Sequence, residues 1–82
     1  MTLIDPIEMK RIRWRSRRGL LELDLVLERF LAQRFETLSQ PQLVAYRELL
    51  DLPDNDFLDV VNGKADLADG ALMEIIGILR TI

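Results

Sequence analysis

The chain has 82 residues, of which 49% are hydrophobic and 30% are charged. This composition is typical of a small globular protein and argues against a disordered or fibrous one. The sequence has no cysteine and no histidine, which excludes disulfides, thiolate or imidazole metal sites, and catalysis by a nucleophile paired with histidine. We therefore expect a single domain over residues 1–82 that binds a partner. We expect no catalytic, metal-binding or cofactor-binding residue in it.

Charge is unevenly distributed along the chain. Residues 1–18 hold six basic and two acidic residues, a net charge of +4, whereas residues 19–82 hold five basic and twelve acidic residues, a net charge of −7. Such a dipolar molecule favours oriented docking to a partner. No apolar stretch approaches the roughly 20 residues that a membrane-spanning helix needs, and the N-terminus lacks the pattern of a secretory signal. We therefore expect a cytoplasmic protein without membrane insertion.

The first helix is expected to run from Pro6 to Arg18. Asp5 is a typical N-cap residue, Pro6 suits the first helical position, and Glu8 would complete a capping box. Gly19 is expected to end this helix, because the residue that follows a helix often has a positive φ, which glycine adopts at little cost.

A second helix is expected over residues 20–35, where apolar residues recur at helical spacing: Leu23, Val26, Leu27, Phe30 and Leu31. Ser39 and Gln42 match a capping box and predict a third helix, which Pro53 ends.

Two short helices are expected in the last third of the chain. Asp54 is expected to cap the fourth helix, which Asn62 and Gly63 terminate. Asp66 or Asp69 is expected to cap the fifth, whose buried stripe is Leu72, Ile75, Ile76 and Leu79. The sequence therefore predicts an all-α fold, a compact bundle of about five short helices.

The first helix has apolar residues on two nearly opposite faces. At 100° per residue, Met9 and Ile12 lie on one face and Trp14 lies on the other. If Met9 and Ile12 pack inward, Trp14 is exposed, and tryptophan and arginine are among the residues most enriched at interaction hot spots. In the alternative, Trp14 packs inward, or an arginine stacks on its ring as a local contact.

The segment between the first two helices combines arginines, a glycine and a carboxylate. Glu22 falls opposite the apolar stripe of the second helix, so it is expected to face solvent, where a partner can reach it. Two structural interpretations compete with this one. In the first, the role of Gly19 is only to end the helix. In the second, Glu22 is only a first-turn acid that the helix dipole stabilises.

Nucleic acid is a further candidate partner for the arginine-rich first helix, because six cations along one helix can neutralise phosphates. The calculated pI of 4.8 and the acidic remainder of the chain favour a solvated or protein-facing surface instead. We therefore do not expect nucleic-acid binding.

Several stretches of the sequence resemble a known protein family. Trp14, followed by the run Arg17-Arg18-Gly19-Leu20-Leu21-Glu22-Leu23-Asp24, is similar to the signature of the SdhE family of small bacterial flavinylation factors. The resemblance continues through Phe30, Phe35 and Leu38-Ser39 into residues 49–58 and covers most of the chain. One departure is Asp59, where many relatives carry tryptophan.

The resemblance implies a helical assembly factor rather than an enzyme. Members of this family bind the apo flavoprotein subunit of succinate dehydrogenase, or of fumarate reductase in some bacteria, and promote covalent attachment of FAD to that subunit. This chain would hold no FAD stably, because the cofactor belongs to the client. The residues matching the interaction motif and its neighbouring surface are Arg18, Gly19, Glu22, Trp14, Arg11 and Asp24. An antitoxin-like or regulatory interaction module is the alternative function.

Overall fold

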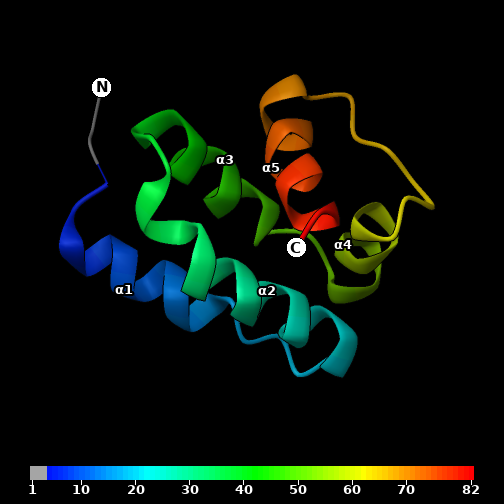
Figure 1. Ribbon diagram of the computed structural model, residues 1–82, viewed down its shortest axis with the longest axis horizontal. Helices are drawn as coiled ribbons and strands as arrows, with labels where there is room; N and C mark the ends of the chain where they lie inside the picture. The colour runs from blue at the N-terminus through cyan, green and yellow to red at the C-terminus, as the bar shows by residue number, and fades with distance from the viewer. Residues whose placement is uncertain (1–3) are drawn as a thin grey trace.

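The computed structural model describes residues 4–82, and this part of the chain is helical with no strand (Figure 1). The elements in chain order are α1 (Pro6–Arg15), α2 (Leu21–Gln33), the short 3-10 helix η1 (Phe35–Thr37), α3 (Gln40–Leu49), α4 (Asp54–Val61) and α5 (Gly70–Arg80). The predicted all-α bundle of five short helices is confirmed. None of the helices in residues 4–82 has the length and apolar character needed to cross a bilayer.

Helix α2 links the two sides of the molecule. Helices α1 and α2 run alongside one another in opposite directions, while α3 and α5 pack together on the other side of α2 (Figure 1). Helix α4 lies at one end, where it contacts both α2 and α5. The connection between α1 and α2 is therefore at the edge of the bundle.

The predicted apolar stripe of α2 faces the core. Leu23, Leu27 and Phe30 are fully buried, and Val26 and Leu31 are half-buried against the same cluster. The ring of Tyr46 on α3 lies between two phenylalanines, with centroids 4.7 Å from Phe30 and 6.1 Å from Phe35. The first contact is tilted and the second is edge-to-face, and both add to the free energy gained by burying the rings.

Three predicted helix starts are confirmed by side-chain caps. Asp5 accepts a hydrogen bond from the Glu8 amide, Ser39 forms a complete capping box with Gln42, and Asp69 accepts bonds from the first turn of α5. Glu8 does not complete the box predicted for α1. Its carboxylate instead lies 3.8 Å from Arg11 and 3.7 Å from Arg47.

Helix α1 ends at Arg15, three residues earlier than predicted. The hydroxyl of Ser16 donates to the Ile12 carbonyl at 2.8 Å and lies 2.6 Å from the Tyr46 hydroxyl, so the chain is anchored to α3 where the helix stops. Gly19 has the expected positive φ of 80°, but it lies within the connection rather than directly after the helix.

Three further boundaries also differ from prediction. Helix α3 ends at Leu49, four residues before Pro53, which is instead the N-cap residue of α4. Helix α2 stops at Gln33 instead of residue 35, because the backbone leaves helical geometry at Arg34 (φ −126°) and continues as η1. Asp54 does not cap α4: the N-cap position is Pro53, and Asp54 is the first helical residue. Its carboxylate is instead bonded to Arg18.

The predicted end of α4 is confirmed, with Asn62 as C-cap and Gly63 at a positive φ of 78°. Of the two candidate caps for α5, Asp69 fills the role. Asp66 instead accepts a bond from Arg80 at 3.2 Å. Arg80 also donates to the Val60 carbonyl at 2.8 Å, which satisfies an acceptor in the last turn of α4.

Candidate functional site

The connection between α1 and α2 is held in shape from within by Asp24. One oxygen of its carboxylate accepts the Arg18 amide at 2.7 Å and the other accepts the Gly19 amide at 3.1 Å. A carboxylate that receives two backbone donors is a strong local anchor. With the positive φ of Gly19, these bonds define a sharp corner of residues 16–20, which we call the Gly19 corner.

The side chain of Arg18 turns into the molecule and bonds to the α3–α4 turn. It is only 13% exposed. Its Nε donates to Asp54 at 2.8 Å, Nη1 to the Leu50 carbonyl at 2.7 Å and Nη2 to the Leu52 carbonyl at 2.5 Å. Because the planar guanidinium has donors along three directions, one residue can join both ends of this turn to the Gly19 corner.

The predicted site residues divide into an inner and an outer set. Arg18 and Asp24 are turned inward and support the corner through the bonds described above. Trp14 is 80% exposed, which confirms that Ile12 packs inward and Trp14 outward. Arg11 and Glu22 are also exposed. Contact of any of these residues with a partner stays a prediction.

The exposed members of the set lie on both sides of the Gly19 corner. Trp14 is in the last turn of α1, and Glu22 is in the first turn of α2. Within residues 4–82, Glu22 takes part in no ion pair. The arrangement displays an aromatic ring and a free carboxylate on a rigid support, which suits recognition of another protein.

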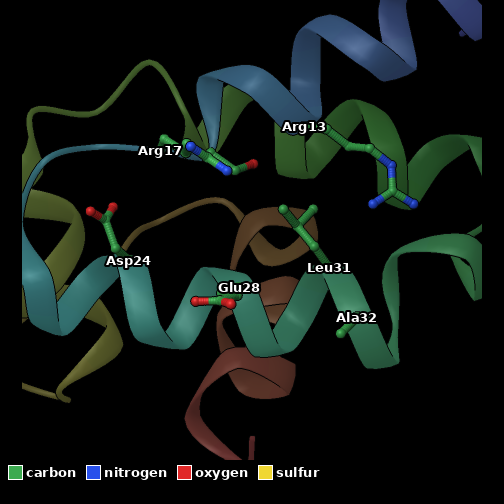
Figure 2. Close-up of a pocket in the computed structure, with 7 residues that line it drawn as sticks. Arg13, Arg17, Asp24, Glu28, Leu31 and Ala32 are labelled. Carbon is green, nitrogen blue, oxygen red and sulfur yellow. The ribbon is translucent and has the colours of Figure 1, made fainter.

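A groove of about 490 Å³ lies between α1 and α2, next to this corner (Figure 2). Arg13 and Arg17 are on the α1 side, and Asp24 and Glu28 are on the α2 side, with Leu31 at its apolar part. Opposite charges on the two walls and the open shape are unlike the enclosed apolar pockets that hold small molecules. No predicted site residue except Asp24 lines this groove.

Sequence reasoning missed two exposed residues near the corner. Arg17 is exposed, whereas its neighbour Arg18 is bonded internally. Two adjacent arginines in a non-helical connection carry no periodic signal that separates them. Leu21 is 72% exposed, and its position off the apolar stripe of α2 is a signal that could have identified it.

Most of the basic residues near the N-terminus are paired within the protein. Arg13 contacts Glu36 at 3.2 Å and lies over the Phe35 ring at 4.6 Å. Arg15 contacts Asp51 at 2.6 Å, and Arg18 has the partners given above. These pairs connect α1 and the corner to η1, the α3–α4 turn and α4, so much of the positive charge is paired with acidic groups of the same molecule rather than displayed as a continuous phosphate-binding strip.

One titratable group near the Gly19 corner, the Tyr46 hydroxyl, has a strongly shifted pKa. Burial raises the pKa of Tyr46 to about 12, although its bond to Ser16 and the nearby Arg18 charge act in the opposite direction. Desolvation dominates because the phenolate form would lie in the core. The Tyr46 hydroxyl is therefore neutral over the physiological range and serves to fix the end of α1.

The comparisons with known proteins agree with the resemblance seen in the sequence. Residues 10–82 match the family described as "Flavinator of succinate dehydrogenase". A protein of Ralstonia nicotianae named "FAD assembly factor SdhE" is 40% identical, over 95% of this chain and 86% of its own length. Proteins of the same name from Coxiella burnetii and Legionella pneumophila are 38% and 36% identical, over 88% and 94% of this chain and 88% and 96% of their own lengths. The chain belongs to the SdhE family of succinate dehydrogenase flavinators.

Proposed function

We propose that this protein binds the apo flavoprotein subunit of succinate dehydrogenase and promotes covalent attachment of FAD to it. The family description and the names of the relatives support this activity. The proposed binding surface is the exposed set around the Gly19 corner, namely Trp14, Arg11 and Glu22, with Gly19 itself.

The observation that carries the proposal is the exposed Trp14 in a helix fixed at that end by buried bonds. A tryptophan that is 80% exposed leaves a large apolar surface in water, and its burial by a partner supplies binding free energy. The Ser16–Tyr46 bond and the Arg18 bonds hold the adjoining backbone. Little conformational entropy therefore has to be lost when a partner binds.

The proposed role requires binding and no catalytic group. A chaperone that favours one conformation of its client by about 2.7 kcal/mol raises the population of that conformation roughly a hundredfold relative to the alternative. FAD is attached to the client, and the residues of this chain act by holding the client in the competent arrangement. We accordingly propose a non-catalytic factor that holds no FAD stably and acts in the cytoplasm, where it would meet the newly made client.

The test is a flavinylation assay with the succinate dehydrogenase flavoprotein subunit. The subunit is expressed without the protein, with the wild type and with Glu22→Ala, and covalent flavin is read by in-gel fluorescence. The matched control is Glu48→Ala, which removes another exposed carboxylate with no ion pair within residues 4–82. A parallel series with the fumarate reductase subunit tests a second client.

We expect fluorescence to depend on the wild-type protein, to fall with Glu22→Ala and to be retained with Glu48→Ala. Circular dichroism should show both variants helical, because the loss of the first-turn acid Glu22 costs at most about 1 kcal/mol and a carboxylate in the last turn of a helix, such as Glu48, is not favoured by the helix dipole. Equal fluorescence with and without the wild-type protein would contradict the proposed function. Full activity of a folded Glu22→Ala variant would contradict only the assignment of Glu22 to the surface.

A further inference from the structure

Arg18 brings together two parts of the chain that are far apart in sequence. Its guanidinium bonds to Asp54, which is 36 residues away, and to two carbonyls of the α3–α4 turn. Its backbone amide bonds to Asp24 on α2. Arg18 therefore holds the Gly19 corner to the α3–α4 turn and α4 through its side chain, and to α2 through its backbone amide.

Asp54 is the one carboxylate among the partners of this guanidinium within residues 4–82. The Arg18 side chain is 13% exposed and that of Asp54 is 39% exposed, so the pair is more shielded from water than an ordinary surface ion pair. Loss of one partner of a shielded pair leaves the other charge poorly compensated. Without Asp54, Arg18 is expected to turn toward solvent and release the corner.

We propose that Asp54 is a positioning residue for partner binding, which acts through Arg18 to fix the Gly19 corner and the first turn of α2. This inference rests on the proposed function, in which that corner meets the flavoprotein subunit. The site then includes Asp54 on α4, a residue that does not have to touch the partner. This positioning role also explains why Asp54 departs from the predicted capping role: its carboxylate is bonded to Arg18 rather than to the amides of its own helix.

The chain supplies two controls for Asp54→Ala. Asp56→Ala removes a second acid from the first turn of α4, so it reproduces the change in helix-dipole interaction without touching Arg18. Glu48→Ala removes an exposed carboxylate in the last turn of α3, next to the α3–α4 turn, which takes part in no ion pair within residues 4–82. Each control removes one carboxylate from the same region as Asp54→Ala.

The experiment measures the Kd of each full-length variant for the purified apo flavoprotein subunit, at a temperature where circular dichroism shows all variants folded. We expect Asp54→Ala to weaken binding roughly fivefold, a typical size for a residue that influences a site without touching its ligand. Glu48→Ala and Asp56→Ala should stay within about twofold of the wild type, as expected for solvent-exposed charges away from the binding surface. Asp54→Asn, which keeps the shape of the side chain, replaces Asp54→Ala if the latter does not fold.

A double-mutant cycle tests whether Asp54 acts through Arg18. In an Arg18→Gln background, Asp54→Ala should have no further effect on Kd, because coupled residues are not additive. In the single variant, the amide resonances of Gly19 and Glu22 should shift in a two-dimensional NMR spectrum, and those of the controls should not. Such shifts report on the corner itself and would not follow from a uniform loss of stability.

Three results would overturn the inference: an unchanged Kd for Asp54→Ala, an equal loss of affinity in the Arg18→Gln background, or unshifted Gly19 and Glu22 resonances. The second result would mean that Asp54 contacts the partner directly. Failure of the wild-type protein to bind the subunit would instead contradict the proposed function. The NMR comparison, which needs no partner, would still decide whether Asp54 fixes the corner.

Discussion

Replacing Gly19 by alanine is expected to act through the backbone alone. Gly19 has a φ of 80°, and a Cβ atom built on it would meet no other atom within 4 Å. Alanine therefore fits the available space but not the backbone conformation. The left-handed region costs a residue with a Cβ about 1–2 kcal/mol relative to its preferred conformations, and the protein must either lose that stability or change the angle of the Gly19 corner.

The stability lost in Gly19→Ala can be measured by thermal unfolding. For a domain of this size, each 1 kcal/mol lost is expected to lower the Tm by about 4–8 °C. Gly63 provides a matched control, because its φ is 78° and a Cβ there also meets nothing within 4 Å. Gly63→Ala should lower the Tm by a similar amount, but at the end of α4 and not at the Gly19 corner.

The affinity for the flavoprotein subunit is expected to distinguish Gly19→Ala from Gly63→Ala. At a temperature where both are folded, Gly19→Ala should weaken the affinity for the flavoprotein subunit and reduce its flavinylation, whereas Gly63→Ala should leave both unchanged. Gly19→Arg places a bulky charged side chain at the same strained position, so its additional loss of affinity measures the effect of that side chain at the corner, separately from the backbone strain. Equal losses of affinity in Gly19→Ala and Gly63→Ala would refute the reasoning, since the effect would then follow global stability.

Two further variants test the structural basis of the corner and of α3. Because burial raises the pKa of Tyr46 from its ordinary value of 10.0 to about 12, the stability from the neutral hydroxyl is complete below pH 10 and is lost as the pH rises to about 12. The loss is of the order of 3 kcal/mol, and urea unfolding of the wild type should show this slope while Tyr46→Phe should not. Ser39→Ala removes the capping box of α3 and should cost about 1 kcal/mol of unfolding free energy, with unchanged affinity for the flavoprotein subunit.

The sequence allowed prediction of those helix starts whose caps are local. The partners of Asp5 and Ser39 lie three residues away, and those of Asp69 two and three residues away, so the pattern contains both the cap and the groups it satisfies. Asp54 carries the same capping group, a carboxylate, but a side chain far away in the sequence competes with the helix amides for it. The Arg18 guanidinium, 36 residues away, takes the carboxylate that the local pattern assigned to a cap.

The end of α1 could not be predicted for a related reason. The helix ends where Ser16 bonds to Tyr46, 30 residues away, and nothing in the spacing of residues 6–18 indicates that contact. The helical wheel puts Trp14 and Ile12 on opposite faces, because that inference needs only the angle between them, but it does not decide which of the two faces packs inward. The inward direction of Arg18 depends instead on the α3–α4 turn, which only the folded chain brings beside it.

Helix α1 combines limited apolar packing with several polar contacts to the rest of the molecule. Of its residues, only Ile12 is fully buried, while Ile7 and Trp14 remain exposed. A helix of 10 residues is not stable alone in water. The contacts of Arg13 and Arg15 with Glu36 and Asp51 attach α1 to η1 and to the α3–α4 turn, so these basic residues are structural. Beside the Gly19 corner, Trp14, Arg17 and Glu22 are exposed and have no ion-pair partner within residues 4–82, so the surface available there combines an aromatic ring with charges of both signs and is less basic than the N-terminal sequence alone indicates.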